Sequence, residues 1–367
     1  MDSIEPQAAV LHEAAPAPPP PVAPLEIRAG RPADDLARDK FVRAHPRGTF
    51  FHLSGWRRVV ERVFAHEASD WIAWRGDAIV GVLPLMRTRS LSMSTQLISM
   101  PYAVYGGAIG IDHAIEKALV DTAVREGTRE RAGRLELRYR DPSGLDLPPY
   151  SLYSTFIRDL PARAEDVLAS IPKKARAECR KARDKHGLDL TEGAWYLRDL
   201  QRLFMNNKRN LGSPGLPFDW FQALLEEFKS DAVVHLVHRG REPLAAVMSF
   251  VYEGTLLAYY AGTADDVDRK YSASNFMYSA LQEWAVERGL SRFDFGRSRR
   301  DSGAFSFKEH QGFEPRDLPY QIALLGDKRM PSFNPSNPKT ERLRKTWSRL
   351  PPWVAGRLSG PISRYLP

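Results

Sequence analysis

The feature that most constrains this fold is an order of secondary-structure elements that occurs twice along the chain. The first half predicts a strand at 25–29, then helices, a hairpin and a further strand, and a closing helix and strand within 113–140. The second half predicts the same order, from a strand at 188–191 to a closing strand at 291–295. Strands that alternate with helices in this way are typical of α/β domains. The repeat therefore predicts a duplicated α/β domain, although two unrelated α/β domains would also fit.

The length of 367 residues supports two domains, because it exceeds what one hydrophobic core usually holds. Its 43% hydrophobic and 27% charged residues exclude the disordered and fibrous classes. A Pro/Ala-rich leader is too poor in apolar residues to fold. The predicted parts are the leader 1–24, a first domain 25–160, a basic helical connector 161–187, a second domain 188–328, and a basic tail 329–367 that contains Pro and Trp.

The single cysteine, Cys179, excludes an internal disulfide and a cysteine-based metal cluster. We expect it to be a passive helix residue in a reducing compartment. Residues 1–25 contain no Lys or Arg, so no signal peptide is expected. Residues 90–111 are uncharged but are too polar and too interrupted by Pro101 and glycines to span a membrane. These observations predict a cytoplasmic protein.

The net charge of +8 is concentrated in two segments. Residues 328–367 hold nine Lys/Arg and one acid, and residues 171–188 hold seven Lys/Arg and two acids. The remainder of the chain is therefore slightly acidic. This distribution indicates an anionic partner that is met at particular places.

The connector carries basic residues at helical spacing, which places them on one helix face. Such a face is either solvated or bound to an anion, such as a pyrophosphate or a nucleic-acid backbone. The residues are Lys173, Arg176, Arg180 and Arg183.

Polar residues follow the strand predicted at 292–295, where Asp294 faces away from the two flanking phenylalanines. We expect Gly296 to end this strand, and a polar turn and a short segment ending at Gly312 to follow. Ligands collect at the carboxyl ends of buried strands in α/β folds. The alternative is an ordinary strand end with solvated charges.

The sequence FDFGRS (293–298), a glycine a few residues on, Phe307-Lys308 and GFEP (312–315) resemble the FemAB-like proteins associated with exosortase/PEP-CTERM systems. These are relatives of the Fem aminoacyltransferases in the GNAT-like acyl-CoA N-acyltransferase superfamily, and the resemblance covers about 45–367. It implies an α/β fold of tandem GNAT-like domains, each a mixed central sheet flanked by helices.

The resemblance implies an N-acyltransferase that moves an acyl or aminoacyl group directly to an amine of a cell-envelope or exopolysaccharide precursor. A splayed strand would polarise the acyl carbonyl through a backbone N–H, and a helix N-terminus would hold the phosphates of the donor. The alternative is a non-catalytic assembly factor that binds an anionic precursor or a membrane surface.

The candidate catalytic residues are Asp294 and Lys308, and Lys308 resembles the lysine of the family's FK motif. Asp294 could bind an amine or accept its proton, or could only anchor Arg297, whereas Lys308 could neutralise charge on either substrate. Tyr105-Gly106-Gly107 either lets backbone approach a ligand or forms a tight turn. The predicted substrate-binding residues are Arg297, Ser298, Gly303, Phe307, Arg209, Tyr105, Gly106 and Gly107.

The donor site should include the basic connector face together with Arg269, Ser274 and Asn275. The family pattern R-x-x-G-x-G/A has serine here at both glycine positions, 272 and 274, and a Cβ restricts close backbone approach. This substitution weakens the acyl-CoA alternative, and the short helix at 171–188 weakens the aminoacyl-tRNA alternative.

We expect no metal and no tightly bound cofactor, with acyl-CoA or aminoacyl-tRNA as the acyl donor. The expected acceptor is an amino sugar or a lipid-linked glycan precursor. The tail combines basic residues with tryptophan and tyrosine, a composition that suits peripheral contact with an anionic membrane at its inner face. The tail could equally be a strap packed on the second domain.

Overall fold

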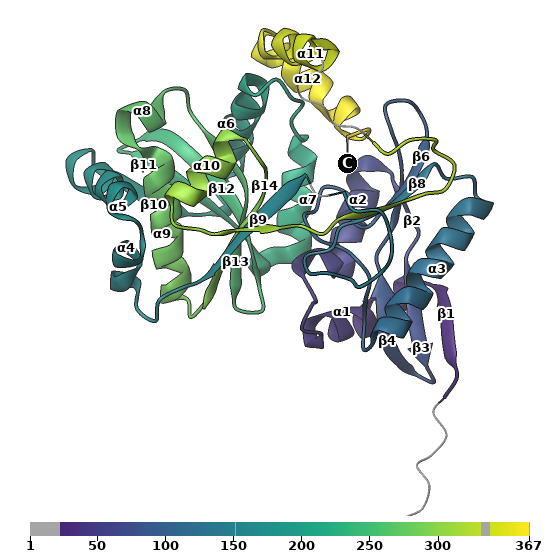
Figure 1. The fold of residues 1–367 in the computed structure, drawn as a ribbon. Helices are drawn as coiled ribbons and strands as arrows, with labels where there is room; N and C mark the ends of the chain where they lie inside the picture. The colour runs from purple at the N-terminus through teal and green to yellow at the C-terminus, as the bar shows by residue number, and fades with distance from the viewer. Residues whose placement is uncertain (1–22, 151, 332–337, 367) are drawn as a thin grey trace, which may run out of the picture.

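The computed structural model describes residues 23–150, 152–331 and 338–366, so nearly all of the expected leader lies outside it. The chain forms two α/β halves side by side, and the C-terminal helices project above their junction (Figure 1).

The first half is built on a four-stranded sheet of order β1-β3-β4-β7 and a five-stranded sheet of order β16-β8-β6-β5-β2. Buried Trp56, Val59 and Val60 recur at helical spacing on α2, which places this helix against the core. The strands are β1 (Leu25–Ala29), β2 (Glu67–Ala68), β3 (Trp71–Arg75), β4 (Ala78–Leu83), β5 (Met86–Arg89), β6 (Thr95–Ile98), β7 (Ile109–Gly110), β8 (Arg134–Leu137) and β16 (Gln321–Leu324), and the α-helices are α1 (Asp35–Ala44), α2 (Ser54–Phe64) and α3 (His113–Arg129).

The second half is built on a seven-stranded sheet of order β10-β11-β12-β13-β14-β9-β15. Its strands are β9 (Tyr153–Asp159), β10 (Leu188–Glu192), β11 (Ala232–Arg239), β12 (Glu242–Tyr252), β13 (Thr255–Thr263), β14 (Arg292–Arg299) and β15 (Pro315–Asp317). Its helices are α4 (Val167–Ser170), α5 (Lys173–Arg180), α6 (Leu197–Asn210), α7 (Phe218–Phe228), α8 (Val267–Tyr271), α9 (Ala273–Glu287) and α10 (Gly303–His310), and the tail forms α11 (Pro338–Ser348) and α12 (Pro352–Ser363).

The two halves repeat one order of elements, as the sequence predicts. Each contains one parallel strand pair, β6 with β8 and β13 with β14. A helix, α3 or α9, connects the two strands of each pair, because parallel neighbours need a crossover connection.

The halves exchange strands. β9 precedes the boundary expected at residue 160, yet it pairs with β14 and β15 in the second sheet. In return, β16 pairs antiparallel with β8 in the first half. The chain therefore crosses the junction twice, and each crossing segment forms a strand of the opposite half, β9 and then β16. The order of elements does not predict this, because each of these strands is short and pairs with a strand that is distant in the sequence.

One hydrophobic core spans the junction. The Phe50 and Phe250 rings stack with centroids 4.5 Å apart, and Trp56 meets Trp220 edge-on at 5.4 Å. All four side chains are fully buried. The apolar surface of each half is thus removed from water by the other half.

We predict that Trp56→Ala lowers the free energy of unfolding by about 3–5 kcal/mol, because it leaves a cavity in this shared core. Urea denaturation followed by far-UV circular dichroism should show one cooperative transition, shifted as a whole. Trp195→Ala is the matched control, since Trp195 is 74% exposed and its loss should change stability by less than about 0.5 kcal/mol. Two separate transitions, only one of them shifted, would contradict a shared core.

Candidate functional site

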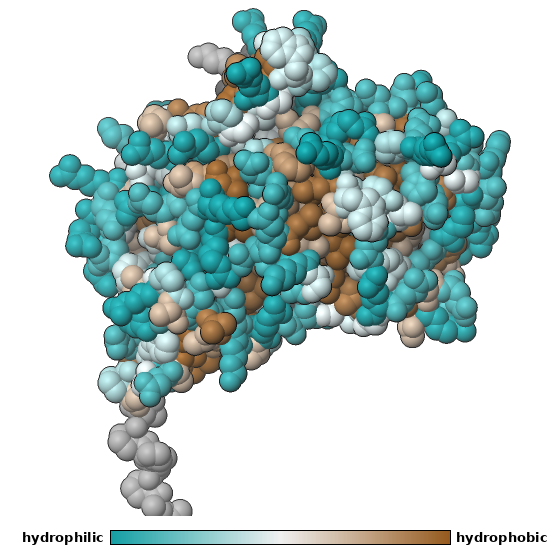
Figure 2. All heavy atoms as spheres, turned by 180° about the vertical axis from the view of Figure 1, so that it is seen from behind, coloured by the Kyte–Doolittle hydropathy of each residue, from teal (hydrophilic) through white to brown (hydrophobic). Residues whose placement is uncertain are grey.

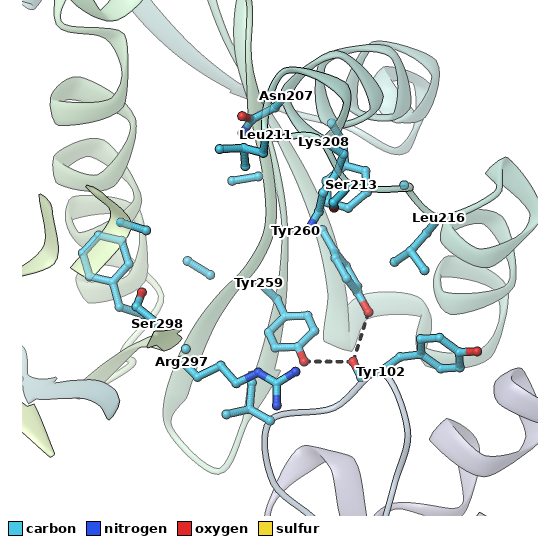
Figure 3. Close-up of a pocket in the computed structure, with 18 of the residues that line it drawn as sticks. Tyr102, Asn207, Lys208, Leu211, Ser213, Leu216, Tyr259, Tyr260, Arg297 and Ser298 are labelled. Atoms are coloured by element: carbon cyan, nitrogen blue, oxygen red, sulfur yellow. Dashed lines mark hydrogen bonds between the residues drawn. The ribbon is translucent and has the colours of Figure 1, made fainter. Parts of the chain in front are cut away.

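The site lies where β13 and β14 separate. These strands pair only from Thr255–Leu257 to Arg292–Asp294, and beyond that point a cavity of about 520 Å³ opens between them. Residues 258–261 of β13 line the cavity (Figure 3), and among the described residues their β14-facing edge has no strand partner. Backbone N–H groups left unpaired at such an edge can donate to a ligand carbonyl. The resemblance implies a splayed strand of this kind.

Parts of both halves and of the tail complete the cavity. α6 contributes its C-terminal end, α9 and α10 form one side, and the segment around Tyr102 comes from the first half. The main lining residues outside the strands are Tyr102, Val104, Phe204, Asn207, Lys208, Leu216, Tyr278, Ala304, Lys308, Ser363 and Leu366.

A bulge in β14 orients the side chains that face this cavity. Gly296 does not end the strand as expected, because β14 continues to Arg299. Asp294 pairs with Ile157 and Arg297 pairs with Thr155, so β14 has one extra residue here. Gly296 has a φ of +66°, which suits a residue without a Cβ. The extra residue turns Arg297 to the face of Asp294, whereas regular alternation would place it with the buried phenylalanines.

Asp294 holds the bulge from one side. Its carboxylate accepts hydrogen bonds from the Gly296 N–H at 2.7 Å and from the Tyr105 hydroxyl at 3.0 Å. Burial raises the pKa of this carboxyl group. Asp294 lines a separate cavity of about 330 Å³ together with Arg140 and Arg158. Asp294, Arg297 and Lys308 therefore do not line one cavity: Arg297 and Lys308 line the main cavity, and Asp294 lines the second.

Lys308 holds the bulge from the other side. Its Nζ donates to the backbone carbonyl oxygens of Phe295, Gly296 and Arg297 at 2.7, 2.9 and 3.3 Å. Burial lowers the pKa of Lys308 to about 7, and the nearby Asp294 carboxylate acts in the opposite direction. Lys308 lines the main cavity, but its N–H groups point to the strand. We call Asp294 and Lys308 the bulge clamp.

Two further cations line the main cavity without a carboxylate partner. Arg297 donates to the Tyr320 hydroxyl at 3.3 Å and lies 4.5 Å from the centre of the Tyr153 ring. Burial lowers the pKa of Lys208, and neighbouring Arg297 lowers it further. Among the described residues, neither cation has an acidic group within ion-pair distance. Lys208 and Arg297 approach the cavity from opposite elements, α6 and β14 (Figure 3). The arrangement can bind an anion.

Arg209 is the predicted substrate-binding residue at this helix end, but its neighbour Lys208 lines the cavity. Arg209 faces the tail, where it donates to the Leu350 carbonyl oxygen at 3.4 Å. A sequence signal for Lys208 exists, because the buried stripe Leu197, Leu200, Phe204 continues to position 208 at helical spacing. A charged residue in line with buried apolar residues on one helix face indicates that a polar cavity lies beside that face.

Two tyrosines tie the unpaired edge of β13 to the first half. The hydroxyls of Tyr259 and Tyr260 donate to the Tyr102 carbonyl oxygen at 2.9 and 3.4 Å, as the dashed lines in Figure 3 show. Burial raises the pKa of both phenols, so they remain protonated donors. The edge is thereby held in place across the junction.

The other predicted substrate-binding residues lie at different places. Ser298 lines the main cavity, Gly303 is exposed at the start of α10, and Phe307 packs 5.7 Å from Tyr278. Tyr105 holds Asp294, as described above. Gly106 and Gly107 are buried, and a Cβ there would lie 2.6 Å from the Ser99 carbonyl oxygen and 2.2 Å from the Tyr139 ring. These glycines serve close packing, not backbone approach to a ligand.

The predicted donor site at the start of α9 is filled by the protein's own carboxylates. The Ser274 N–H and hydroxyl donate to Asp268 at 2.6 and 2.8 Å, and the Ser272 hydroxyl donates to Glu178 at 2.5 Å. Asn275 accepts from Gln311 at 2.6 Å, and exposed Arg269 pairs with Asp266 at 3.1 Å. None of the three predicted residues lines the main cavity.

The basic connector face is also divided. A π-helical turn at 181–185 interrupts the expected continuous helix. Arg183 pairs with Glu283 of α9 at 2.5 Å, and Arg176 donates to the Ala169 carbonyl oxygen at 3.4 Å. Lys173 and Arg180 are exposed, and none of these four residues lines the main cavity.

Cys179 is buried and donates to the Asn275 carbonyl oxygen at 3.2 Å. Burial raises the pKa of its thiol to about 11, as expected of a passive helix residue. Within the described ranges, no three His, Cys, Asp or Glu side chains are grouped to bind a metal ion. A search of the same residues finds no helix with the length and apolar character needed to cross a bilayer.

Residues 170–309 match a family model described as an acetyltransferase (GNAT) domain. This segment contains β13, the bulge and most of the cavity, and the match confirms the predicted acyltransferase class. A search of curated protein sequences gives no match.

Solved structures with the same fold include three that cover most of this chain. The crystal structure of FemX is 14% identical with a TM-score of 0.62 and covers 82% of this chain and 98% of its own. The C-terminal domain of a protein described as a lysylphosphatidylglycerol synthetase from Agrobacterium fabrum is 13% identical, with a TM-score of 0.52 and coverage of 79% and 91%. A tandem GNAT protein from the clavulanic acid biosynthesis pathway is 12% identical, with a TM-score of 0.51 and coverage of 83% and 100%. These similarities confirm the predicted tandem GNAT-like fold, while the exosortase association stays a prediction.

We predict that Lys308→Met changes how stability depends on pH. The unfolded chain holds the Lys308 proton up to its ordinary pKa of 10.5, whereas the folded protein releases it near pH 7. Between these values the unfolded state binds more protons, so the Lys308 contribution favours folding increasingly as pH rises. Urea denaturation at pH 6.5 and 9.5 should show a larger gain with pH in the native protein than in the variant. Equal gains would show that the proton of Lys308 is not linked to folding.

Proposed function

We propose that this protein is an N-acyltransferase that joins an acyl or aminoacyl group to an amine inside the cavity between β13 and β14. The observation that carries the proposal is the unpaired edge at 258–261 beside two partly buried cations. The amine nitrogen attacks the acyl carbonyl carbon and forms a C–N bond. The bond from that carbon to the donor's oxygen or sulfur breaks, and the amine proton passes to the leaving group through solvent. N–H groups at the unpaired edge stabilise the oxyanion.

Arg297 and Lys208 are the proposed anchors for an anionic group of a substrate. Both are partly buried, so their charges act in a medium of lower dielectric than water. A guanidinium and an ammonium on opposite walls suit a phosphate. This favours a phosphate-bearing acceptor, such as an amino sugar or lipid-linked glycan precursor of the cell envelope or of an exopolysaccharide. One structural neighbour is described as a synthetase of lysylphosphatidylglycerol, an aminoacylated lipid.

The donor is proposed to bind without a diphosphate at the start of α9. A diphosphate there would have to displace the Asp268 carboxylate, which already accepts from the backbone of Ser274. Acyl-CoA and aminoacyl-tRNA are both candidate donors, and Asp268→Ala tests whether CoA uses this helix end. The variant should bind CoA more tightly only if CoA uses this helix end, since a competing carboxylate has been removed.

A non-catalytic factor that binds an anionic envelope precursor is the second candidate. The bulge clamp favours it, because the N–H groups of Lys308 are occupied by backbone and Asp294 lies outside the main cavity. For a non-catalytic factor, the bulge clamp would maintain the shape of a binding cavity in which no reaction takes place. The proposed place of action for either function is the cytoplasm, with peripheral contact at the inner membrane face.

We predict that Arg297→Gln and Lys208→Met each lower kcat/KM by about 10- to 100-fold, the effect of losing one charge-assisted contact to an anion. Transfer is measured by mass spectrometry of the acceptor after incubation with acetyl-CoA or aminoacyl-tRNA and UDP-amino sugars. Arg300→Gln is the matched control, because Arg300 is exposed and pairs with Asp317 outside the cavity.

Full activity in both variants would rule out these anchors. An acceptor that binds and is never acylated by either donor would leave the non-catalytic function in place.

A further inference from the structure

The tail is a helical strap across the top of the junction (Figure 1). The Tyr102 hydroxyl donates to the Ser363 carbonyl oxygen at 3.3 Å, and the Gly215 N–H donates to the Ser359 hydroxyl at 3.1 Å. The inward face of α12 consists of buried Ala355, Ser359 and Ser363, spaced four residues apart. The tail is therefore docked on the protein through small side chains. This agrees with the expectation of a packed strap.

The outward face of the tail carries large apolar and basic side chains. Trp353 and Leu343 are each 72% exposed, and Leu358 is also exposed. Within the described part of the tail, Glu341 is the one acidic residue, and it pairs with Lys345 at 2.6 Å. Five exposed arginines on α11, α12 and their flanks have no carboxylate within ion-pair distance among the described residues: Arg342, Arg344, Arg349, Arg357 and Arg364.

This distribution is the inverse of an ordinary surface helix, which buries its large apolar side chains. On α12, Trp353 and Arg357 lie on the side opposite the buried small residues. In Figure 2, hydrophilic spheres alternate with pale and brown ones on the projection at the top of the molecule. Tryptophan and arginine together suit the headgroup layer of a bilayer. A nucleic acid would account for the arginines but not for exposed Leu343 and Leu358.

We propose that this outward face, defined by Arg342, Leu343, Arg349, Trp353 and Arg357, binds the surface of an anionic bilayer. The positive charge of the face complements anionic headgroups, and Trp353 and Leu343 enter the interface. The end of the same strap lines the main cavity through Ser363 and Leu366. Binding therefore brings the cavity to the headgroup layer, where a lipid-linked acceptor would enter. That last step rests on the proposed function, whereas membrane binding does not.

The test is co-sedimentation of the full chain with phosphatidylcholine vesicles that contain or lack phosphatidylglycerol. The native protein should bind the anionic vesicles and release them as salt increases. Arg349→Gln with Arg357→Gln should weaken binding by on the order of fivefold for each arginine neutralised. Trp353→Ala with Leu343→Ala should also weaken it, and should abolish quenching of tryptophan fluorescence by brominated phosphatidylglycerol.

Matched controls lie outside the tail. Trp195→Ala removes an equally exposed tryptophan, and Arg241→Gln neutralises an exposed arginine in the β11–β12 turn, so both should leave vesicle binding unchanged. Circular dichroism verifies that each variant is folded. Equal binding by tail and control variants, or binding to transfer RNA but not to anionic vesicles, would overturn the proposal.

Transfer to a water-soluble amine acceptor, measured without vesicles, separates this inference from the proposed function. Tail variants that lose vesicle binding should keep this activity, because none of their residues lines the cavity. If vesicle binding is lost only together with folding or soluble-acceptor turnover, the face is not a membrane surface.

Discussion

The structure of the site depends on one irregularity in a buried strand, the bulge at Gly296. Opening a strand ladder in the interior leaves backbone carbonyls to be satisfied, and an unpaired buried carbonyl is costly. Lys308 satisfies three of them, while the Asp294 carboxylate takes the Gly296 N–H on the opposite side. A buried ammonium and a buried carboxylate thus stabilise each other through the strand that they hold. The bulge directs Arg297 toward the cavity.

The exchange of strands between the halves fixes the positions of the elements that line this cavity. The unpaired edge of β13 belongs to the second half, yet Tyr259 and Tyr260 anchor it to Tyr102 of the first. β9 and β16 cross in opposite directions, and the aromatic core is common to both halves. Movement of one half against the other would break strand pairing and expose apolar surface together. A site assembled in this way is preorganised, so little substrate binding energy is needed to form it.

Charge is placed differently at the start of α9 and in the main cavity. At the start of α9, Asp268 and Glu178 occupy the donors that a GNAT domain would offer to a diphosphate. In the main cavity, cations stand without carboxylates, so an incoming anion gains attraction without displacing a partner. Some of the connector arginines, which lie at helical spacing, are already paired within the protein, as the Arg183–Glu283 ion pair shows. Positive charge in the sequence is therefore a poor guide to where an anion binds.

The sequence by itself determined the duplicated α/β order, the amphipathic helices and the polar segment at 292–308, because hydrophobic periodicity and turn residues are local signals. It also selected Arg297, Ser298 and Lys308, which do line one cavity. Only the tertiary structure decided that Asp294 lines a different cavity, that Lys208 and not Arg209 lines the main one, and that Gly106 and Gly107 are packed against neighbouring groups. Each of these outcomes depends on a bulge, on a strand that crosses between the halves, or on a side chain from a distant segment. Such contacts follow no fixed spacing in the sequence, so a sequence pattern cannot predict them.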